Sequence, residues 1–436
     1  MREDFDVAVI GGGPAGSTAA AFLAGGGARV SVFEREQFPR FHIGESLLPF
    51  NMDIFARLGI RDQLEENFIQ KWGAEFISGD GEAHEVFHFE NGLIPGRPMC
   101  YQVLRSRFDQ MLLDTADARG AEIYQGHSVL SAVPSSRTGA RLRVRDLTGN
   151  ESEIHARFIL DASGRDSMLG SRMGVRRMNR HLRKVALFAH FENVPRSPGR
   201  DEGNIVLILM SDGWFWFIPL KGAITSIGLV LNGRRLKESG LQPEEAFEAA
   251  VASCPAAEKR LRQARRVSPV MAASDWSYRC RRLRGDGYLL VGDAASFVDP
   301  IFSSGVYLAM SSGELAAKAL LEALENHDLS PRSFRGYERA VRRQVDMYTG
   351  LAQRFYQPGF TDVCLSPGKR LRLTPAVISL LAGCVERRWP LRWRLALFYS
   401  IVRLQRFIPL APRQNLRPVF EPPSRSPADR GATGIA

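Results

Sequence analysis

The sequence predicts an α/β fold with a parallel β-sheet, an inserted, mainly antiparallel β-sheet and a helical C-terminal region. Residues 6–34 alternate an apolar strand, a glycine-rich turn, a small-residue helix and a second strand. Strand-like runs and helical runs then interleave as far as Gly305, which opens a long helical stretch. The last ninety residues are basic and helical in pattern. These three observations together predict the fold class.

The glycine-rich turn lies in DVAVIGGGPAGSTAAAFLAGGGARVSVFE, residues 6–34. Gly11 allows a tight turn, Gly13 lets backbone N–H groups approach a pyrophosphate, and Gly16 lets the helix pack closely on the strands. Glu34 ends the second strand, where a carboxylate accepts ribose hydroxyls and repels a 2′-phosphate. A glycine turn alone could bind nothing, but strand, helix, second strand and acid occur here in order. We therefore predict a Rossmann-like dinucleotide site that does not take NADP.

Composition narrows the class of protein. The chain has 436 residues, 44% of them hydrophobic and 24% charged, which is typical of a globular protein of two or three domains. Residues 1–5 do not resemble a signal peptide, and no apolar run approaches the roughly 20 residues that span a bilayer. Five cysteines occur without CxxC spacing, which favours a reducing compartment, so we expect a cytoplasmic protein. No metal site is predicted.

The formal net charge is +11, which raises the question of an anionic partner. No zinc-ligand spacing, aromatic-basic RNA motif or basic-region heptad is present, so we predict no nucleic-acid binding. Residues 369–417 hold eleven Lys or Arg against one acid, Glu386, with aromatic residues between them. This pattern fits docking of an acidic carrier protein, peripheral contact with a membrane, or a helical cap with a solvated basic face.

Parallel and antiparallel segments interleave, so the nucleotide domain is predicted to be discontinuous. Strands are expected at residues 74–77, 129–159, 205–210, 214–220 and 288–291, and a helix at residues 101–119. The predicted domains are residues 1–345, with inserted sheet segments at about 72–100 and 180–270, a basic helical region at 346–420, and a disordered tail at 421–436.

Two later turns in the sequence also combine glycine with an acidic residue. Asp161 begins an acid-small-glycine run at a strand end, and Gly292 with Asp293 follows another strand. With Glu34 they resemble the three fingerprints of the p-hydroxybenzoate hydroxylase-like FAD enzymes, which implies FAD as the cofactor. The residues that this resemblance assigns to FAD binding are Gly11, Gly13, Ala15, Gly16, Glu34, Arg35, Glu45, Ser46, Arg105, Asp161, Gly292 and Asp293.

A more specific resemblance is to the flavin-dependent halogenases. WFWFIP at residues 214–219 satisfies their WxWxIP signature, and FHIGES at 41–46 and DPIFSSGV at 299–306 resemble their loops beside the flavin ring. WFWFIP alone could be an aromatic core strand. The resemblance implies a strand that keeps organic substrate away from the flavin, made of Trp214, Trp216, Ile218 and Pro219.

In that family, reduced FAD, O₂ and a halide give hypohalous acid. Ser304 and Gly305 match the halide loop, where backbone N–H groups at a helix start suit an anion. Lys71 in KWGAEF matches the lysine that receives the oxidised halogen and delivers it to an electron-rich ring. A lysine offers donors on a flexible stem, and burial would favour its nucleophilic amine. The alternative is a solvent-facing lysine at a strand start.

Tryptophan-specific members of the family carry an acid shortly before the halide loop, where this chain has Ile301 and Phe302. The chain therefore resembles members that act on phenols, pyrroles or acyl groups tethered to a carrier protein in secondary metabolism. Only one nucleotide fold is found, so a separate flavin reductase is expected to supply reduced FAD. Two alternatives stay open. One is an FAD monooxygenase or geranylgeranyl reductase-type enzyme without halide chemistry. The other is a flavin-loaded scaffold that only binds.

Overall fold

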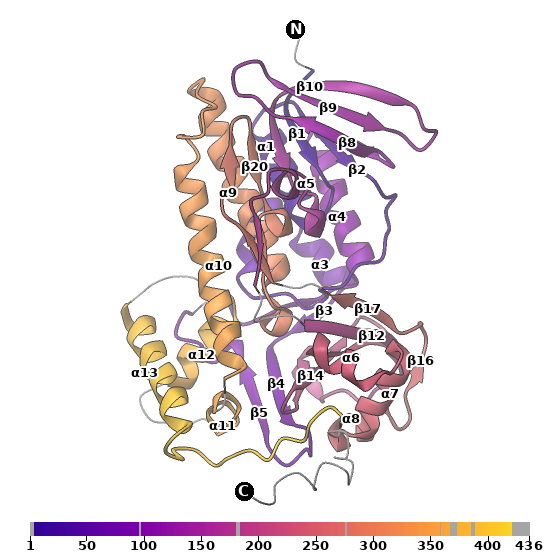
Figure 1. The fold of residues 1–436 in the computed structure, drawn as a ribbon, viewed down its shortest axis with the longest axis vertical. Helices are drawn as coiled ribbons and strands as arrows, with labels where there is room; N and C mark the ends of the chain where they lie inside the picture. Colours follow the sequence, from indigo (N-terminus) through magenta and orange to yellow (C-terminus); the bar gives the residue numbers. More distant parts are fainter. Residues whose placement is uncertain are drawn as a thin grey trace, which may run out of the picture.

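The computed structural model describes residues 4–95, 97–179, 184–274, 277–357, 359–366, 373–384 and 389–420. Two large β-sheets lie one above the other in Figure 1, and the long helix α10 (Arg335–Phe355) runs along the side of both. The predicted tail at 421–436, and the parts of the basic region at 367–372 and 385–388, lie outside the described residues.

The first sheet is built around β1, whose residues are apolar and almost fully buried because helices and neighbouring strands cover it. Strands β20, β10, β1, β2 and β7 are parallel, which confirms the α/β class. The order is β19 (Arg284–Gly285), β20 (Tyr288–Leu290), β10 (Glu151–Asp161), β1 (Phe5–Ile10), β2 (Val30–Glu34) and β7 (Glu122–Gln125), with β8 (Ser128–Val133) and β9 (Ala140–Arg145) added antiparallel beside β10.

Helices α1 (Pro14–Gly25), α4 (Arg105–Ala118) and α9 (Gly305–Glu325) pack together on this sheet. Small residues allow the contact: a side chain at Gly313 of α9 would lie 2.5 Å from the carbonyl oxygen of Ala15 on α1. The predicted long helix from Gly305 is confirmed. Because α1 starts at the glycine turn and α9 at the predicted halide loop, this packing holds both loops at one end of the sheet.

The second sheet is mainly antiparallel and takes its strands from two distant parts of the chain. Its order is β16 (Arg265–Arg266), β12 (Lys184–Glu192), β15 (Ile224–Asn232), β14 (Gly213–Pro219), β13 (Ile205–Leu209), β4 (Gly73–Ser78) and β5 (His84–His88), with β17 (Met271–Ser274) also paired to β12. Only the pair β13 and β4 is parallel. The domain boundaries themselves stay a prediction.

Strand β14 separates two apolar cores by its alternation. Trp214, Trp216 and Ile218 face the core shared with the first sheet. Phe215 and Phe217 face the opposite core, where Phe215 contacts Phe247 at a ring separation of 6.1 Å. This period-2 pattern places the two tryptophans toward the nucleotide-binding side.

Shorter elements complete the connections. They are α2 (Asn51–Leu58), α3 (Arg61–Asn67), η1 (Phe89–Asn91), η2 (Gly164–Asp166), α5 (Met168–Arg172), η3 (Gly199–Gly203), α6 (Gly233–Ser239), α7 (Pro243–Ala252), α8 (Pro255–Leu261), η4 (Gly292–Ala294) and η5 (Pro300–Phe302). Two small sheets pair β3 (Ile69–Lys71) with β6 (Cys100–Gln102), and β18 (Tyr278–Cys280) with β11 (Arg176–Met178) and β21 (Ser296–Phe297). The expected helix at 101–119 begins only at Arg105, since Cys100–Gln102 pairs with β3.

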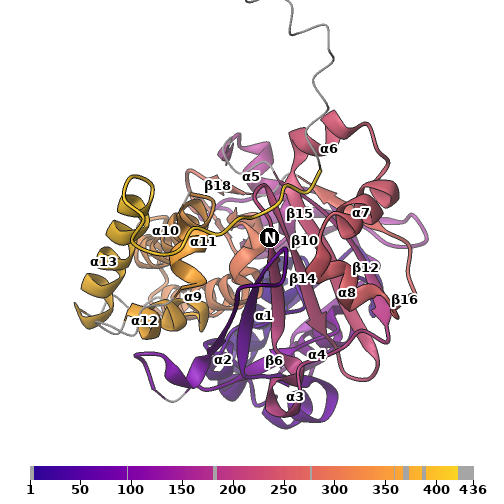
Figure 2. The same cartoon turned by 90° about the horizontal axis from the view of Figure 1, so that it is seen from below.

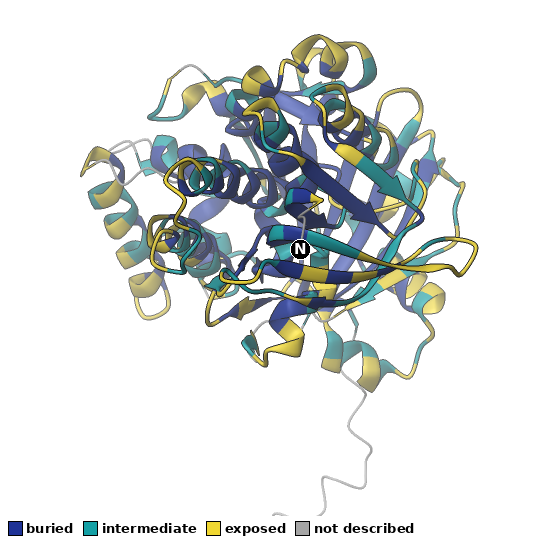
Figure 3. Ribbon diagram, turned by 90° about the horizontal axis from the view of Figure 1, so that it is seen from above, coloured by how far each residue is buried: buried dark blue, intermediate teal, exposed yellow. Residues whose placement is uncertain are grey.

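The C-terminal region is helical where it is described, with α11 (Phe360–Cys364), α12 (Leu373–Leu381) and α13 (Trp389–Gln405). Residues 406–420 then cross beneath the second sheet toward α6 (Figure 2). The amide of Val419 donates to Asp212 Oδ1 at 2.7 Å, which ties this segment to the start of β14. Figure 3 shows buried residues concentrated in the two sheets and exposed residues on the outer faces of the helices. Of the helices that the structure describes, none is long and apolar enough to cross a membrane.

Candidate active site

The predicted glycine turn lies between β1 and α1. Gly11 has φ +102°, and a side chain there would overlap the carbonyl of Ala162. A side chain at Gly16 would overlap the carbonyl of Gly11. Gly13 caps α1 without a side-chain hydrogen bond. The turn therefore keeps the helix N-terminus open, as a pyrophosphate requires.

Glu34 shapes this turn from the end of β2. Its Oε2 accepts from the amide of Gly12 at 2.8 Å and its Oε1 accepts from the amide of Glu36 at 3.0 Å. Each carboxylate oxygen has two lone pairs, so acceptor capacity for ribose hydroxyls is left. Arg35, also predicted to bind cofactor, is exposed and its Nη1 lies 2.6 Å from Asp166 Oδ2.

The other two acids of the predicted fingerprints differ in their surroundings. The carboxylate of Asp161 is buried and accepts from the amide and hydroxyl of Ser163 and from the amide of Leu169. It thus fixes the turn after β10. The partly buried carboxylate of Asp293 accepts no hydrogen bond within the described residues, and burial raises its pKa to about 6 against the opposing charges of Arg105 and Arg165. Asp293 has free acceptors for a ligand.

A paired charge cluster stands beside the glycine turn. Arg105 is buried and donates from Nε and Nη2 to both oxygens of Asp109 at 2.8 Å, and from Nη1 to the carbonyl of Ile43. Arg40 Nη1 lies 3.3 Å from Asp109 Oδ2, yet it is buried without a hydrogen-bond partner in the described residues. Arg40 was not singled out from the sequence, because no motif marks it. A side chain at Gly13 would lie 3.5 Å from Arg40 Nη2.

These residues fit a bound FAD. The open N-terminus of α1 and the unsatisfied donor of Arg40 suit a pyrophosphate, and the free carboxylate of Asp293 suits a sugar hydroxyl. Gly292 supports the same loop: it has φ +57°, and its amide donates to Ser312 at 2.8 Å. A buried, unpaired donor in a folded protein normally has a ligand or water to satisfy it.

Lys71 ends β3 and is buried rather than solvent-facing, with 2% of its surface exposed. Its Nζ donates to Ser46 Oγ at 2.9 Å and to the carbonyl of Leu47 at 3.0 Å, and it lies 5.3 Å from the centre of the Phe89 ring. Burial lowers the pKa of this amine to about 8, with a small opposing effect of Cys100. The groups that the structure describes around this amine are neutral. Both the charged ammonium and the neutral, nucleophilic amine are therefore accessible near neutral pH.

The predicted halide loop forms a second small site. Ser303 has φ +53°, and Ser304 then caps helix α9, which begins at Gly305. Ser304 is buried, and its Oγ has no hydrogen-bond partner in the described residues. Asp299 steadies the loop by accepting from the amide of Ile301 at 3.1 Å. An orphaned hydroxyl beside a helix N-terminus is a place where an anion can bind.

A hydrogen-bonded chain ties this loop to the WxWxIP strand. Trp214 Nε1 donates to Tyr356 Oη at 3.0 Å, and Tyr356 Oη donates to Asp299 at 3.1 Å. Burial raises the pKa of Asp299 to about 6, although the Ile301 amide, Lys184 and Tyr356 oppose this. Tyr356 follows α10, far away in sequence, and no local pattern indicates it.

An aromatic stack extends from the same strand to the loop at residues 41–46. Ring centres are 6.1 Å apart between Trp214 and Trp216, 6.1 Å between Trp216 and Phe188, and 6.2 Å between Phe188 and Phe41. Gly228 makes room for the Trp216 ring, which a side chain there would overlap. Ile218 shares the face of the tryptophans, whereas the strand alternation places Pro219 on the other face.

The loop at residues 41–46 brings the predicted residues together. Ser46 accepts from Lys71, and Glu45 Oε1 lies 3.0 Å from His190 Nε2. A side chain at Gly44 would lie 2.9 Å from Arg105 and 3.9 Å from Val306, next to the halide loop. Ser46 therefore supports the lysine whereas Glu45 pairs with His190, and no hydrogen bond in the described residues joins Lys71 to Ser304 directly.

Comparisons with known proteins identify the family of this chain. A model of the FAD binding domain family matches residues 4–344. A 1H-pyrrole-2-carbonyl-[peptidyl-carrier protein] chlorinase of Pseudomonas fluorescens is 33% identical over 406 residues, 88% of this chain and 90% of that protein. The solved myxobacterial chondrochloren halogenase is 34% identical, with a TM-score of 0.77 over 92% of this chain and 97% of that one. A flavoprotein/dehydrogenase of Cytophaga hutchinsonii is 28% identical, with a TM-score of 0.84 over 92% and 98%.

The chain is an FAD-dependent oxidoreductase of the FAD binding domain family. Within that class it belongs to the flavin-dependent halogenases, and FAD is its cofactor. The predicted family, fold and cofactor are thereby confirmed. The roles of the single site residues stay predictions.

Proposed function

We propose that this halogenase acts on an electron-rich phenol- or pyrrole-like acyl group held on a carrier protein, with Lys71 as the residue that delivers the halogen. The observation that carries the proposal is the buried, unpaired amine of Lys71, held by Ser46 and Leu47. When bound, reduced FAD with O₂ supplies the oxidising power that turns a halide into hypohalous acid.

The halide would be held at the start of α9. The Ser304 hydroxyl and the amide of Gly305 offer donors to an anion that has lost its water, and the helix dipole adds a favourable field there. The buried faces of Trp214 and Trp216 would keep the organic substrate out of this compartment. Their apolar rings also exclude water, which would otherwise dilute the hypohalous acid.

Lys71 would then receive the oxidised halogen. Its ammonium form can donate a hydrogen bond to hypohalous acid. Its neutral form can take the halogen on nitrogen as the O–halogen bond breaks, and the hydroxide leaves with an amine proton as water. With a pKa of about 8, both forms are present at neutral to mildly basic pH. In either form the two existing hydrogen bonds orient Nζ, so the halogen is presented from a fixed point.

Two features support a carrier-bound substrate. The chlorinase that matches 88% of the chain is named for a pyrrole on a peptidyl-carrier protein. Residues 389–420 also contain six arginines and no acid, which favours an acidic protein partner.

We further propose that a separate flavin reductase supplies reduced FAD. We place the reaction in the cytoplasm, where the five buried cysteines suit the reducing conditions.

The test is mass spectrometry of products formed with a flavin reductase, NADH, O₂ and chloride or bromide in turn. Aryl acids are supplied free and as carrier-protein thioesters. We expect a halogenated thioester, no product without halide, and loss of product with Lys71→Ala. Halogenation only of the free acid would contradict the carrier assignment. A product that gains oxygen but no halogen, or full activity of Lys71→Ala, would contradict the assigned mechanism.

A further inference from the structure

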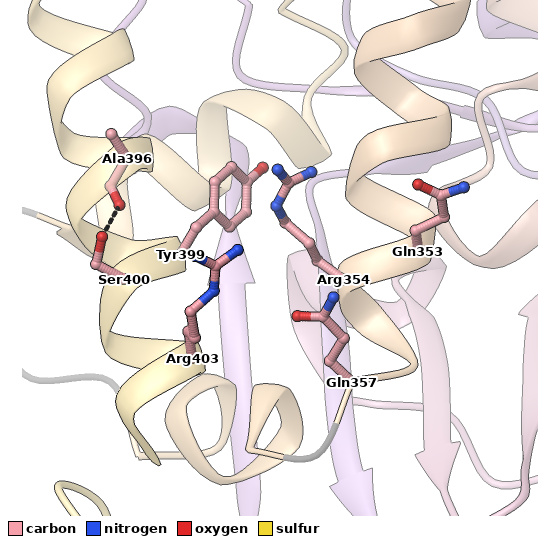
Figure 4. A pocket seen from close by; sticks show the side chains of 7 residues that line it. All are labelled: Gln353, Arg354, Gln357, Ala396, Tyr399, Ser400 and Arg403. Carbon is pink, nitrogen blue, oxygen red and sulfur yellow. Dashed lines mark hydrogen bonds between the residues drawn. The ribbon is translucent and has the colours of Figure 1, made fainter. Parts of the chain in front are cut away.

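A polar hollow of about 390 Å³ lies between helices α10 and α13. Figure 4 shows Arg354 and Gln357 entering it from the α10 side and Tyr399 and Arg403 from the α13 side. The remaining lining residues are Gln353, Ala396 and Ser400. Among the described residues that line this hollow, two are arginines and none has a carboxylate.

The donors of this hollow are largely unused. The Arg354 guanidinium lies 4.4 Å from the centre of the Tyr399 ring and donates only from Nη1, to the carbonyl of Gly350 at 2.7 Å. Arg403 has no hydrogen bond or ion pair within the described residues, and neither do the side-chain amides of Gln353 and Gln357. Two cations that line one concave surface repel each other, and an anion bound between them would offset that repulsion.

The C-terminal segment that supplies one wall of the hollow has the same sign of charge. Residues 389–420 contain six arginines, namely Arg392, Arg394, Arg403, Arg406, Arg413 and Arg417, and no Asp or Glu. Trp389 and Phe407, at either end of α13, are 73% and 71% exposed. Exposed aromatic residues beside arginines are typical of a surface that binds a partner.

The hollow is also next to the catalytic elements. Arg354 and Gln357 are on either side of Tyr356, which donates to Asp299 of the halide loop and accepts from Trp214. The hollow and the residues that connect the halide loop with the WxWxIP strand therefore share the C-terminal end of α10.

We propose that Arg354 and Arg403 bind the phosphate of the phosphopantetheine arm on a carrier protein. The proposal rests on the carrier-bound substrate proposed above, and it assigns the phosphate-binding part of that partner's recognition. Arginine pairs bind phosphate oxygens through planar, two-pronged hydrogen bonds, and the glutamine amides and Tyr399 hydroxyl can meet the polar pantetheine chain. A volume of about 390 Å³ is sufficient for a phosphate and part of that chain.

The test uses the FAD-loaded, full-length protein and isothermal titration calorimetry, with no turnover. The probes are 4′-phosphopantetheine, pantetheine without the phosphate, inorganic phosphate, and vesicles of anionic phospholipid. We expect phosphopantetheine to bind at least about tenfold more tightly than pantetheine or inorganic phosphate. Arg354→Gln and Arg403→Gln should each remove that preference. Arg392→Gln, which changes an exposed arginine of α13 outside the hollow, should retain it.

Equal binding of pantetheine and phosphopantetheine would overturn the phosphate assignment. Equal binding of inorganic phosphate would reduce the site to a general anion site, and binding only to vesicles would assign the surface to a membrane. A loss with Arg392→Gln as large as with Arg403→Gln would show general charge attraction instead of a site. Binding is measured without halogenation. A failed halogenation assay would therefore contradict the proposed function without changing the measured binding of phosphopantetheine.

Discussion

Two buried cations of this protein have opposite surroundings. Arg105 has Asp109 opposite it, and the two side chains are 5% and 0% exposed. Burial alone lowers the pKa of Arg105, but the charge and hydrogen bonds of Asp109 raise it above its ordinary value. Lys71 has only a hydroxyl, a carbonyl, a thiol and an aromatic ring around it, and burial lowers its pKa to about 8.

The difference separates a charge that its partner keeps ionised from a charge that can titrate near neutral pH. A paired buried charge stays ionised and holds its neighbours in place, whereas an unpaired one is held near its titration point at a cost in folding free energy. Arg105 can thus position the loop at residues 41–46, through the carbonyl of Ile43, without taking part in proton transfer. Lys71 contacts the end of the same loop, at Ser46 and Leu47, and its amine can change its charge.

The largest effect is expected from breaking the paired cluster. Asp109→Ala leaves Arg105 buried without its partner, so the free energy of unfolding should fall by about 3–5 kcal/mol. Urea unfolding measures this. The control is Asp114→Ala, which removes an exposed acid of the same helix and should change stability by less than about 0.5 kcal/mol. Equal stability of the two variants would show that Arg105 does not depend on Asp109.

The second largest effect is expected at Lys71, the buried cation without a carboxylate partner. Lys71→Met fills the same space without the amine, so halogenation should fall by about 100-fold, or about 2.7 kcal/mol, while the free energy of unfolding stays equal or rises. Product formation and urea unfolding are measured on the same sample. Lys221→Met, at an exposed lysine, should leave both unchanged. A large fall in the free energy of unfolding of Lys71→Met would show that this lysine stabilises the fold.

A smaller effect is expected where the halide loop meets the WxWxIP strand. Tyr356→Phe removes the hydrogen bonds to Trp214 and Asp299, so the loop holding Ser304 should be less well positioned. We expect the KM for halide to rise about tenfold, with FAD affinity unchanged. Tyr124→Phe, which removes a hydroxyl that donates to Glu122 at 2.7 Å on β7, is the control. An unchanged KM for halide would show that the hydroxyl of Tyr356 does not position the halide loop.

The smallest effect is the pH dependence of halogen transfer. The amine of Lys71 loses its proton as pH rises through about 8, so the neutral form increases about threefold between pH 7.5 and 8.5. If the neutral amine takes the halogen, the rate of transfer rises over this range, which is the result we expect. Flavin oxidation at the same pH values is the control. A rate that falls over this range would assign the transfer to the protonated amine as a hydrogen-bond donor.

Local patterns predicted much of the fold and part of the site. The glycine turn with Glu34 and the start of α9 at Gly305 all lie where short-range signals place them. The start of α4 differed, because Cys100–Gln102 pairs with β3, a partner that a helical period does not reveal. Arg40, Tyr356 and the hollow at Arg354 were beyond sequence reasoning, since each depends on a neighbour distant in the chain.

The sequence by itself determined the α/β class through its local pattern of strand, turn and helix. It determined the family and the cofactor through the resemblance of its glycine turn, its acids and its tryptophan strand to known motifs. Only the tertiary structure decided the states of the side chains. Whether Lys71 is buried without a carboxylate, and whether Ser304 has no hydrogen-bond partner in the described residues, depends on which distant segments pack around them. Desolvation and hydrogen bonding arise from that packing, and they set the reactivity that the motifs alone only suggest.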